Sequence, residues 1–246
     1  MCIRDSKNII RASNVDVICT TDDPADELCY HEKIAQDEHF TTRVLPAFRP
    51  DKGINIRRSG WREYIAALSE AAGMPITDLE SLKAAYSARL DYFAEHGCVT
   101  ADHGIDDAIP AAERHELARA DEIFRAALSG KQPSEHEGGI FALEMHRFFA
   151  GEYTRRGWVM QIHFGVMRTP CTPMFERLGP DSGFDIIGGR SSVTELARML
   201  DLFAIENALP RTVIYSVNPA DNAAIGTLIG GFQLTDGSGM PRVMQG

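Results

Sequence analysis

Short apolar runs alternate along the chain with long segments whose apolar residues recur at helical spacing. The short runs are rich in β-branched residues, and each stops at a polar or ionisable side chain, as buried strands that lead into loops do. The predicted strands cover residues 15–21, 43–48, 98–101, 158–162 and 212–217. Strands that alternate with helices predict βα units and therefore a parallel sheet.

The longer segments carry helix start and stop signals. Thr77 and Ser134 are each followed three residues later by a glutamate, the spacing of a capping box. Gly97 and Gly157 stand where the apolar periodicity ends, and we expect them to terminate these helices. We interpret two mostly helical stretches as insertions in the α/β domain, at residues 54–95 and 111–156.

The polar residues at the strand ends favour a barrel over other α/β folds. In barrels of this type the chemistry lies on the loops after the strands. A doubly wound sheet fits the alternation almost as well, but no Gly-x-Gly-x-x-Gly follows a predicted strand, so nucleotide binding has little support. Five strands are too few to close an eight-stranded barrel. The alternatives are a complete open-sheet domain and a piece of a larger protein.

Composition narrows the class of protein. The 246 residues are 44% hydrophobic and 24% charged, enough apolar material for a sizeable core, and the net charge of −10 argues against a nucleic-acid binder. No apolar stretch approaches the length of a membrane span, so no membrane partner is expected. Five scattered cysteines without a Cys-x-x-Cys pair favour a reduced, cytoplasmic setting.

Several motifs occur in a fixed order and together resemble one family. They are Thr20-Thr21-Asp22-Asp23-Pro24, Arg49-Pro50-Asp51-Lys52, Gly97-Cys98-x-x-x-Asp102-His103, residues 155–165 (Arg-Arg-Gly-Trp-Val-Met-Gln-x-His-x-Gly), residues 178–185 (Leu-Gly-Pro-Asp-x-Gly-Phe-Asp) and Asn218-Pro219-x-Asp221-Asn222. The set is similar to bacterial uronate isomerase (glucuronate isomerase) over roughly residues 7–245. The first six residues do not look like family sequence, and we interpret residues 1–6 as a non-native extension and residues 7–246 as one incomplete barrel domain.

The resemblance implies a fold, a reaction and a cofactor. It implies a distorted TIM-like (β/α)8 barrel of the amidohydrolase superfamily, of which this chain would be a central part lacking the first and last strands. It implies aldose–ketose isomerisation of D-glucuronate to D-fructuronate and of D-galacturonate to D-tagaturonate. It also implies a divalent metal, zinc by expectation, held by a His-x-His and a late aspartate that this chain does not contain. We further expect a homo-oligomer.

His163 and His103 are the candidate catalytic residues. His163 follows an apolar strand and precedes Gly165, and strand-end histidines of the superfamily ligate metal or bind substrate; the alternative is a structural histidine at a barrel rim. His103 follows Asp102 at another strand end, but neighbours on a strand point to opposite faces, so the two need not meet. For this site the alternative is that Asp102 caps a turn.

The candidate substrate-binding residues are two arginines and two turn residues. Arg49 and Arg168 have guanidinium groups that bind a carboxylate in bidentate fashion, although Arg49 could instead pair with a loop acid such as Asp51. Asp23 precedes Pro24 and could bind sugar hydroxyls or start a helix. Asn218 precedes Pro219 and has the same two interpretations, with capping favoured.

Two other functions stay open at this stage. A catalytically inactive sugar-acid binding or structural module would explain the missing His-x-His. A metal-dependent hydrolase of the same superfamily would share the barrel and the strand-end histidines. Resemblance in the loops after the first two strands favours the isomerase.

Overall fold

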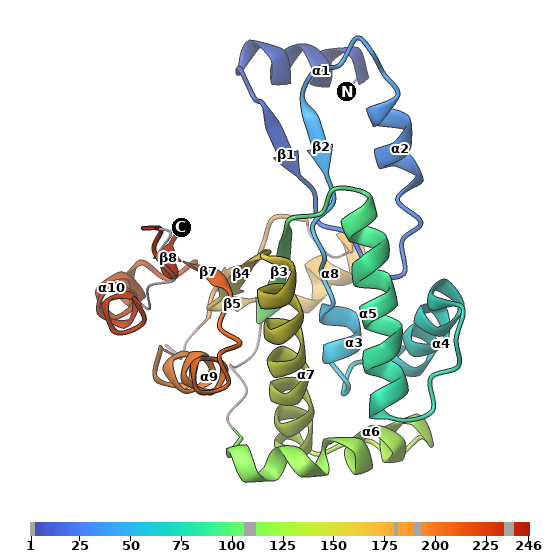
Figure 1. Ribbon diagram of the computed structural model, residues 1–246, viewed down its shortest axis with the longest axis vertical. Coiled ribbons are helices and arrows are strands. Elements are labelled where there is room, and N and C mark those ends of the chain that lie inside the picture. Colours follow the sequence, from blue (N-terminus) through green and yellow to red (C-terminus); the bar gives the residue numbers. More distant parts are fainter. Residues whose placement is uncertain (1–2, 106–111, 180–181, 189–192, 234–238) are drawn as a thin grey trace.

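Strands alternate along the chain with single helices or groups of helices, except that β5 follows β4 directly (Figure 1). The computed structural model describes residues 3–105, 112–179, 182–188, 193–233 and 239–246. The strands are β1 (Val17–Cys19), β2 (Arg43–Leu45), β3 (Thr100–Ile105), β4 (Val159–Phe164), β5 (Val166–Met167), β6 (Ile186–Ile187), β7 (Arg211–Ser216) and β8 (Val243–Gln245). The helices are α1 (Ile3–Ala12), α2 (Cys29–Ala35), α3 (Asp51–Ile54), α4 (Trp61–Ala72), α5 (Leu79–Glu95), α6 (Ala120–Leu128), α7 (Glu135–Arg156), α8 (Thr172–Leu178), α9 (Val193–Ile205) and α10 (Asn222–Gly231), with short 3-10 turns η1 (Arg114–Arg119) and η2 (Pro219–Asp221).

The main sheet is parallel, as the alternation predicts. Strands β3, β4, β7 and β8 pair in that order, and β1 pairs with β2. Single bridges from Phe48 to Asp22 and to Ala101 join the two parts. Across the described residues these parallel strands therefore follow chain order, whereas a doubly wound sheet reverses its strand order. The parallel α/β class is confirmed, and the described strands form an open sheet.

The two faces of this sheet differ in burial. In β4 the side chains of Met160, Ile162 and Phe164 are buried, while those of Gln161 and His163 are not. The buried face packs on α7, through an aromatic cluster that also receives Phe48 from the loop after β2. Its members are Phe48, Tyr86, Phe93, Phe149, Tyr153 and Trp158. The opposite face is the one that carries polar side chains at the strand ends.

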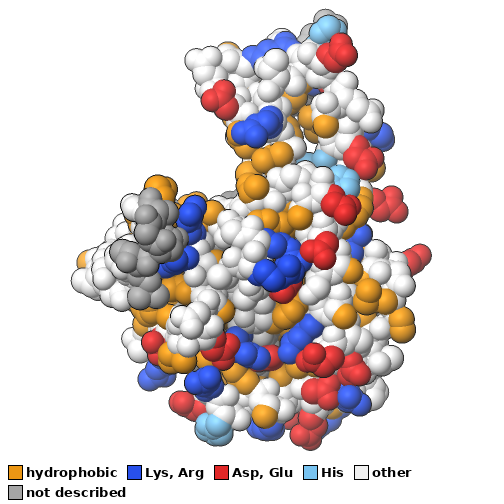
Figure 2. Space-filling view, viewed as in Figure 1, with side chains coloured by type: hydrophobic (Ala, Val, Ile, Leu, Met, Phe, Trp, Pro, Cys, Tyr) orange, Lys and Arg blue, Asp and Glu red, His pale blue; other side chains and the backbone are white. Residues whose placement is uncertain are grey.

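Both predicted helical stretches contain helices. Residues 54–95 hold α4 and α5, and the described part of 111–156, which omits residue 111, holds η1, α6 and α7. That these stretches are insertions in a barrel stays a prediction. Figure 2 shows acidic and basic side chains interspersed over this half of the molecule, so the net charge of −10 is not gathered in one field on this face.

The predicted caps are confirmed at α7, and at α5 the stop at Gly97 is confirmed (φ +82°) while the start is displaced. Ser134 and Glu137 form a reciprocal capping box at the start of α7, and Gly157 ends that helix in the left-handed region at φ +69°. The box predicted at Thr77 is wrong by one residue. Asp78 is the N-cap of α5, because its carboxylate accepts the backbone N–H of Ser81 at 2.8 Å.

Several elements depart from the sequence predictions. Strands β1 and β2 are shorter than predicted, and the antiparallel pair of β5 and β6 was not predicted. The helix α1 precedes the first strand, so residues 3–6 are its first turn, while residues 1 and 2 lie outside the described part. The chain closes with a strand, β8, beside β7. Strand β3 runs four residues past its predicted end. Its backbone pairs with β4 from Thr100 to Ile105, so the polar residues of this stretch are held in the sheet by ladder hydrogen bonds. Among the described helices, none is long and apolar enough to cross a bilayer.

Candidate functional site

Four side chains meet where β3 and β4 end, and we call them the strand-end cluster: Arg49, Asp51, Asp102 and His163. The guanidinium of Arg49 places Nε 2.7 Å from Oδ2 of Asp51 and Nη1 3.2 Å from Oδ2 of Asp102. On its other side, Oδ1 of Asp102 lies 3.2 Å from Nε2 of His163. Contacts between these ionisable side chains thus connect the loop after β2 to the two neighbouring strands, β3 and β4.

Strand register and alternation explain why these residues meet. Gly104 of β3 is the Cα partner of His163 in β4, so Asp102, two residues before Gly104, faces the same side of the sheet as His163. Arg49 is brought beside them because it follows Phe48, which bridges β3, and its backbone N–H donates to the carbonyl of Asp22 at 2.9 Å.

The two carboxylates of the cluster are largely buried. Asp51 accepts the N–H of Gly104 at 2.9 Å as well as Nε of Arg49, and burial raises its pKa to about 6 against the lowering effect of Arg49. The Oδ1 atom of Asp102 is buried and makes no hydrogen bond of good geometry, although His163 lies close to it. A buried oxygen without a full partner is costly, and such atoms mark places where a ligand group fits.

The ring of His163 is held by an aromatic neighbour. Its side chain is 48% exposed and stacks on Tyr215 of β7, with ring centroids 4.5 Å apart. The hydroxyl of Tyr215 donates to Oε1 of Gln161 at 3.3 Å, and the amide of Gln161 donates to Thr100 at 3.0 Å. Tyr215 was not among the predicted site residues, although its place in the predicted strand 212–217 could have indicated it.

The structure does not bring His103 to this cluster. Its side chain lies on the opposite face of β3, fully buried against α7, with Nε2 2.9 Å from the hydroxyl of Tyr153 and its ring 5.2 Å from that of His146. Burial, and then the neighbouring His146, hold the pKa of His103 well below its ordinary value. The alternation of side chains along β3 places Asp102 in the cluster instead, so this strand end contributes the carboxylate and not the imidazole.

Asp23 lies beside the cluster and is fully engaged. Its Oδ1 accepts the hydroxyl of Tyr64 at 3.1 Å and the backbone N–H of Ala25 at 2.9 Å. Its Oδ2 lies 3.0 Å from Nζ of Lys52, a side chain that follows Asp51 in the sequence. Asp23 therefore performs the turn role that the sequence allowed, and it also holds an exposed lysine near the site.

The other two predicted residues have local structural partners. Arg168 lies in the segment that carries β5 and β6, where Nη1 is 2.8 Å from Asp185. Asn218 caps η2, because its side chain accepts the N–H of Ala220 at 3.1 Å. This is the capping interpretation favoured from the sequence. Part of the motif at 178–185, residues 180 and 181, lies outside the described residues.

The cluster offers too few ligands for a complete metal site. Asp102 and His163 supply one oxygen and one nitrogen side by side, whereas a catalytic zinc takes three protein ligands. In the part of the chain that the structure describes, no three histidine, cysteine, aspartate or glutamate side chains gather as a metal-binding group. Asp102 and His163 are therefore candidates for two of the ligands of a metal.

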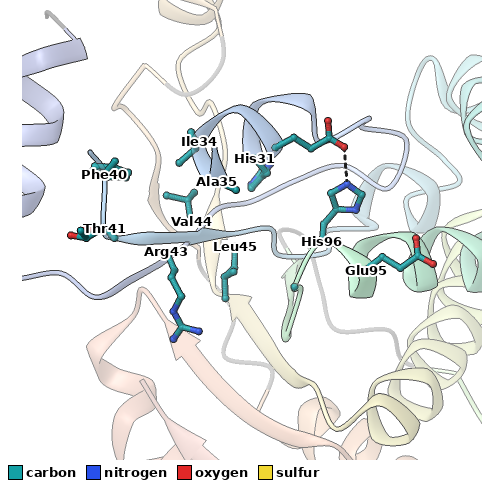
Figure 3. Close-up of a pocket in the computed structure, with 13 residues that line it drawn as sticks. His31, Ile34, Ala35, Phe40, Thr41, Arg43, Val44, Leu45, Glu95 and His96 are labelled. Atoms are coloured by element: carbon teal, nitrogen blue, oxygen red, sulfur yellow. Dashed lines mark hydrogen bonds and ion pairs between the residues drawn. The ribbon is translucent and has the colours of Figure 1, made fainter. Parts of the chain in front are cut away.

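A cavity of about 450 Å³ lies at the other end of β2, between that strand, α2 and the end of α5 (Figure 3). Two of its polar side chains are already paired: Nε2 of His96 lies 3.2 Å from Glu32, and Nε2 of His31 lies 2.8 Å from the hydroxyl of Thr20. These internal pairs leave the strand-end cluster as the better candidate site.

The carboxyl ends of the strands of a parallel α/β sheet are where proteins of this class carry their ligand and active sites. The glucuronate isomerase family model matches residues 4–246, and the chain therefore belongs to the glucuronate isomerase family.

Solved structures agree in fold. The uronate isomerase of Thermotoga maritima is 28% identical with a TM-score of 0.83, covering 97% of this chain and 50% of its own. The glucuronate isomerase of Caulobacter crescentus is 21% identical with a TM-score of 0.81, covering 97% of this chain and 47% of its own. A uronate isomerase of Bacillus halodurans C-125 is 12% identical with a TM-score of 0.60, covering 100% of this chain and 47% of its own. The last two show the fold alone, and this chain spans about half the length of each.

Proposed function

We propose that the strand-end cluster is part of the active site of a hexuronate isomerase, which interconverts D-glucuronate with D-fructuronate and D-galacturonate with D-tagaturonate. The observation that carries this proposal is the family match over residues 4–246 together with an arginine, a buried carboxylate and an imidazole at adjacent strand ends. An open-chain uronate offers a carboxylate at one end and the reacting C1 and C2 at the other, and these need a cation and a proton-transfer group.

In this proposal each member of the cluster has one task. Arg49 binds the substrate carboxylate, because its planar fork matches that group and already contacts two carboxylates of the protein. His163, half exposed and with Nε2 3.2 Å from Oδ1 of Asp102, moves the proton between C2 and C1. Asp102 and Tyr215 orient its imidazole. A role for His103, Arg168, Asp23 or Asn218 in catalysis or binding stays a prediction.

Four finer properties belong to the same proposal. Strands in chain order with polar carboxyl ends support a partial (β/α)8 barrel of amidohydrolase type, whose remaining strands would lie outside this chain. Zinc stays the expected metal, with His163 one candidate ligand. A cytoplasmic location and a homo-oligomer remain expectations from composition and resemblance.

A sugar-acid binding module without catalysis is the second candidate. It is favoured by a specific feature of the sequence: none of the eight histidines forms a His-x-His pair, the metal-binding element that the resemblance implies. The cluster could still bind a uronate through Arg49. The two functions differ in one observable, the loss of the substrate C2 proton to solvent.

Proton exchange in D2O separates them. The chain is incubated with D-glucuronate and zinc, and ¹H NMR follows binding, the C2 proton and the appearance of ketose signals. Exchange that falls about 10²- to 10⁴-fold in His163→Ala supports the isomerase. Saturable binding with neither exchange nor ketose signals supports the binding module. Absence of saturable binding overturns both.

A further inference from the structure

Gly104 and Asp51 lie against the guanidinium of Arg49 from the strand side. We propose that both are positioning residues for Arg49: Gly104 provides the space in which the guanidinium lies, and Asp51 fixes its Nε edge. The inference rests on the proposed role of Arg49 in binding the substrate carboxylate. It adds two residues to the determinants of carboxylate recognition, neither of which would touch the substrate.

The space over Gly104 is occupied by the arginine. A Cβ atom at this position would lie 2.3 Å from Nη2 of Arg49, 3.4 Å from its Cζ and 3.0 Å from Oδ2 of Asp51. The backbone of Gly104 is not in the left-handed region, so the glycine is needed here for room and not for its conformation. Glycine weakens a strand interior and commonly marks a close approach by another group, which here is the guanidinium.

The atoms that such a Cβ would meet are the ends of side chains. Alanine at position 104 would therefore displace the guanidinium and leave the ladder between β3 and β4 in place. The substitution would therefore change the position of Arg49 without changing the fold of the sheet, since the end of a side chain moves at much lower cost in free energy than packed backbone.

Asp51 ties the guanidinium to the strand. One oxygen, Oδ2, accepts both the backbone N–H of Gly104 at 2.9 Å and Nε of Arg49 at 2.7 Å. Its side chain is only 16% exposed, so solvent competes little with these two bonds. The carboxylate therefore fixes the distance between the backbone of β3 and the arginine fork.

The resulting position is next to the proton-transfer group. Gly104 and His163 are register partners and face the same side of the sheet, so a guanidinium that lies over Gly104 is beside the imidazole. Asp102 holds Nη1 at 3.2 Å from the same side. A substrate carboxylate bound by Arg49 would place its sugar chain within reach of His163, and this placement depends on a fixed guanidinium.

The first test observes the Nε–H group of Arg49 by NMR in the absence of a ligand. In ¹⁵N-labelled chain, the Nε–H of Arg49 should give a protected NMR signal, assigned by its loss in Arg49→Met. Gly104→Ala and Asp51→Asn should shift this signal or expose it to solvent exchange. Gly139→Ala, a glycine of α7 with open space around it, is the matched control and should leave it unchanged. An unchanged Arg49 signal in Gly104→Ala overturns the proposal.

The second test measures the affinity of each variant for a charged and an uncharged ligand. D-glucuronate and its uncharged amide, D-glucuronamide, are titrated into each variant by NMR. Gly104→Ala should weaken D-glucuronate binding roughly 10- to 100-fold, the range for a lost hydrogen bond to a charged group. It should change the affinity for D-glucuronamide by less than about 2-fold. In a chain that already carries Arg49→Met, Gly104→Ala should cause no further loss of D-glucuronate affinity. Equal loss for both ligands means general distortion and overturns the proposal. If wild-type chain and Arg49→Met bind D-glucuronate alike, the proposed function fails, while the first test still decides the placement.

Discussion

The buried pair of histidines between β3 and α7 makes acid stability a direct test of the core. Burial lowers the pKa of His146 from 6.5 to about 4, and burial and His146 lower that of His103 as well. Below pH 6.5 the unfolded chain takes up a proton on His146 that the folded chain excludes until about pH 4. Stability is therefore lost as the pH falls through this window, in total about 3 kcal/mol for His146, of which about 2 kcal/mol is lost by pH 5.

The variant His146→Phe removes this titration and keeps an aromatic ring beside His103. We expect urea unfolding, followed by tryptophan fluorescence, to show that wild-type chain loses about 2 kcal/mol more between pH 7.5 and pH 5 than the variant does. The comparison of slopes is needed because Asp51 acts in the opposite sense. Its pKa is raised by burial to about 6, so the folded chain gains stability on that account as the pH falls below 6.

His136 supplies the matched control for this experiment. It lies on the same helix, is 55% exposed and pairs with Glu116 at the surface. His136→Gln should keep the wild-type pH dependence within about 0.5 kcal/mol. Equal pH dependence in His146→Phe and wild type would refute the reasoning, because it would mean that His146 is hydrated or protonated in the folded chain.

Three further predictions concern the core, an ion-pair network and a cap. Phe149→Ala should lower the free energy of unfolding by about 3–5 kcal/mol, measured by urea titration, since the ring is fully buried among other aromatic rings. Glu144→Ala should lower the free energy of unfolding by about 3–5 kcal/mol in the same assay. The Glu144 carboxylate is 4% exposed, and its removal leaves Lys83 and Arg147 without their buried partner. A loss below about 1 kcal/mol would contradict this reasoning. Asn218→Ala should cost about 0.5–2 kcal/mol and leave D-glucuronate affinity unchanged, whereas weaker binding at unchanged stability would favour a substrate contact.

The sequence predicts strands and helices well where their signal is local. Alternating apolar runs and the Ser134 capping box depend on neighbours a few residues apart, and the corresponding elements are present. The end of β3 was misplaced because Asp102 and His103 look like a loop until the pairing with β4 is known. Strand β8 was missed because three residues are too few to show an alternating pattern, and helix α1 was missed because residues 1–6 were interpreted as a non-native extension.

Two of the predicted site residues, Arg49 and His163, were chosen because a suitable residue type coincides with a strand end. The structure brings these two residues together through Asp102, and their roles stay predictions. His103 was chosen over Asp102 as a catalytic candidate because only the burial of α7 against β3 decides which of two neighbours faces the helices. Tyr215 contributes through stacking on a ring from another strand, a contact that spacing along the chain does not encode.

The attachment of Phe48 has a consequence for local opening of the fold. Phe48 donates its N–H to Thr100 and accepts that of Asp102, and its ring lies in the aromatic cluster. The residue before Arg49 is thus anchored from both backbone and side chain, and its bridge to Ala101 is the described backbone pairing that connects the loop after β2 to β3. Segments of a fold can open locally with less free energy than global unfolding requires. The backbone amide hydrogens of Phe48 and Asp102 should therefore exchange with solvent at the same rate. This common rate measures how often Arg49 leaves its place beside the imidazole of His163.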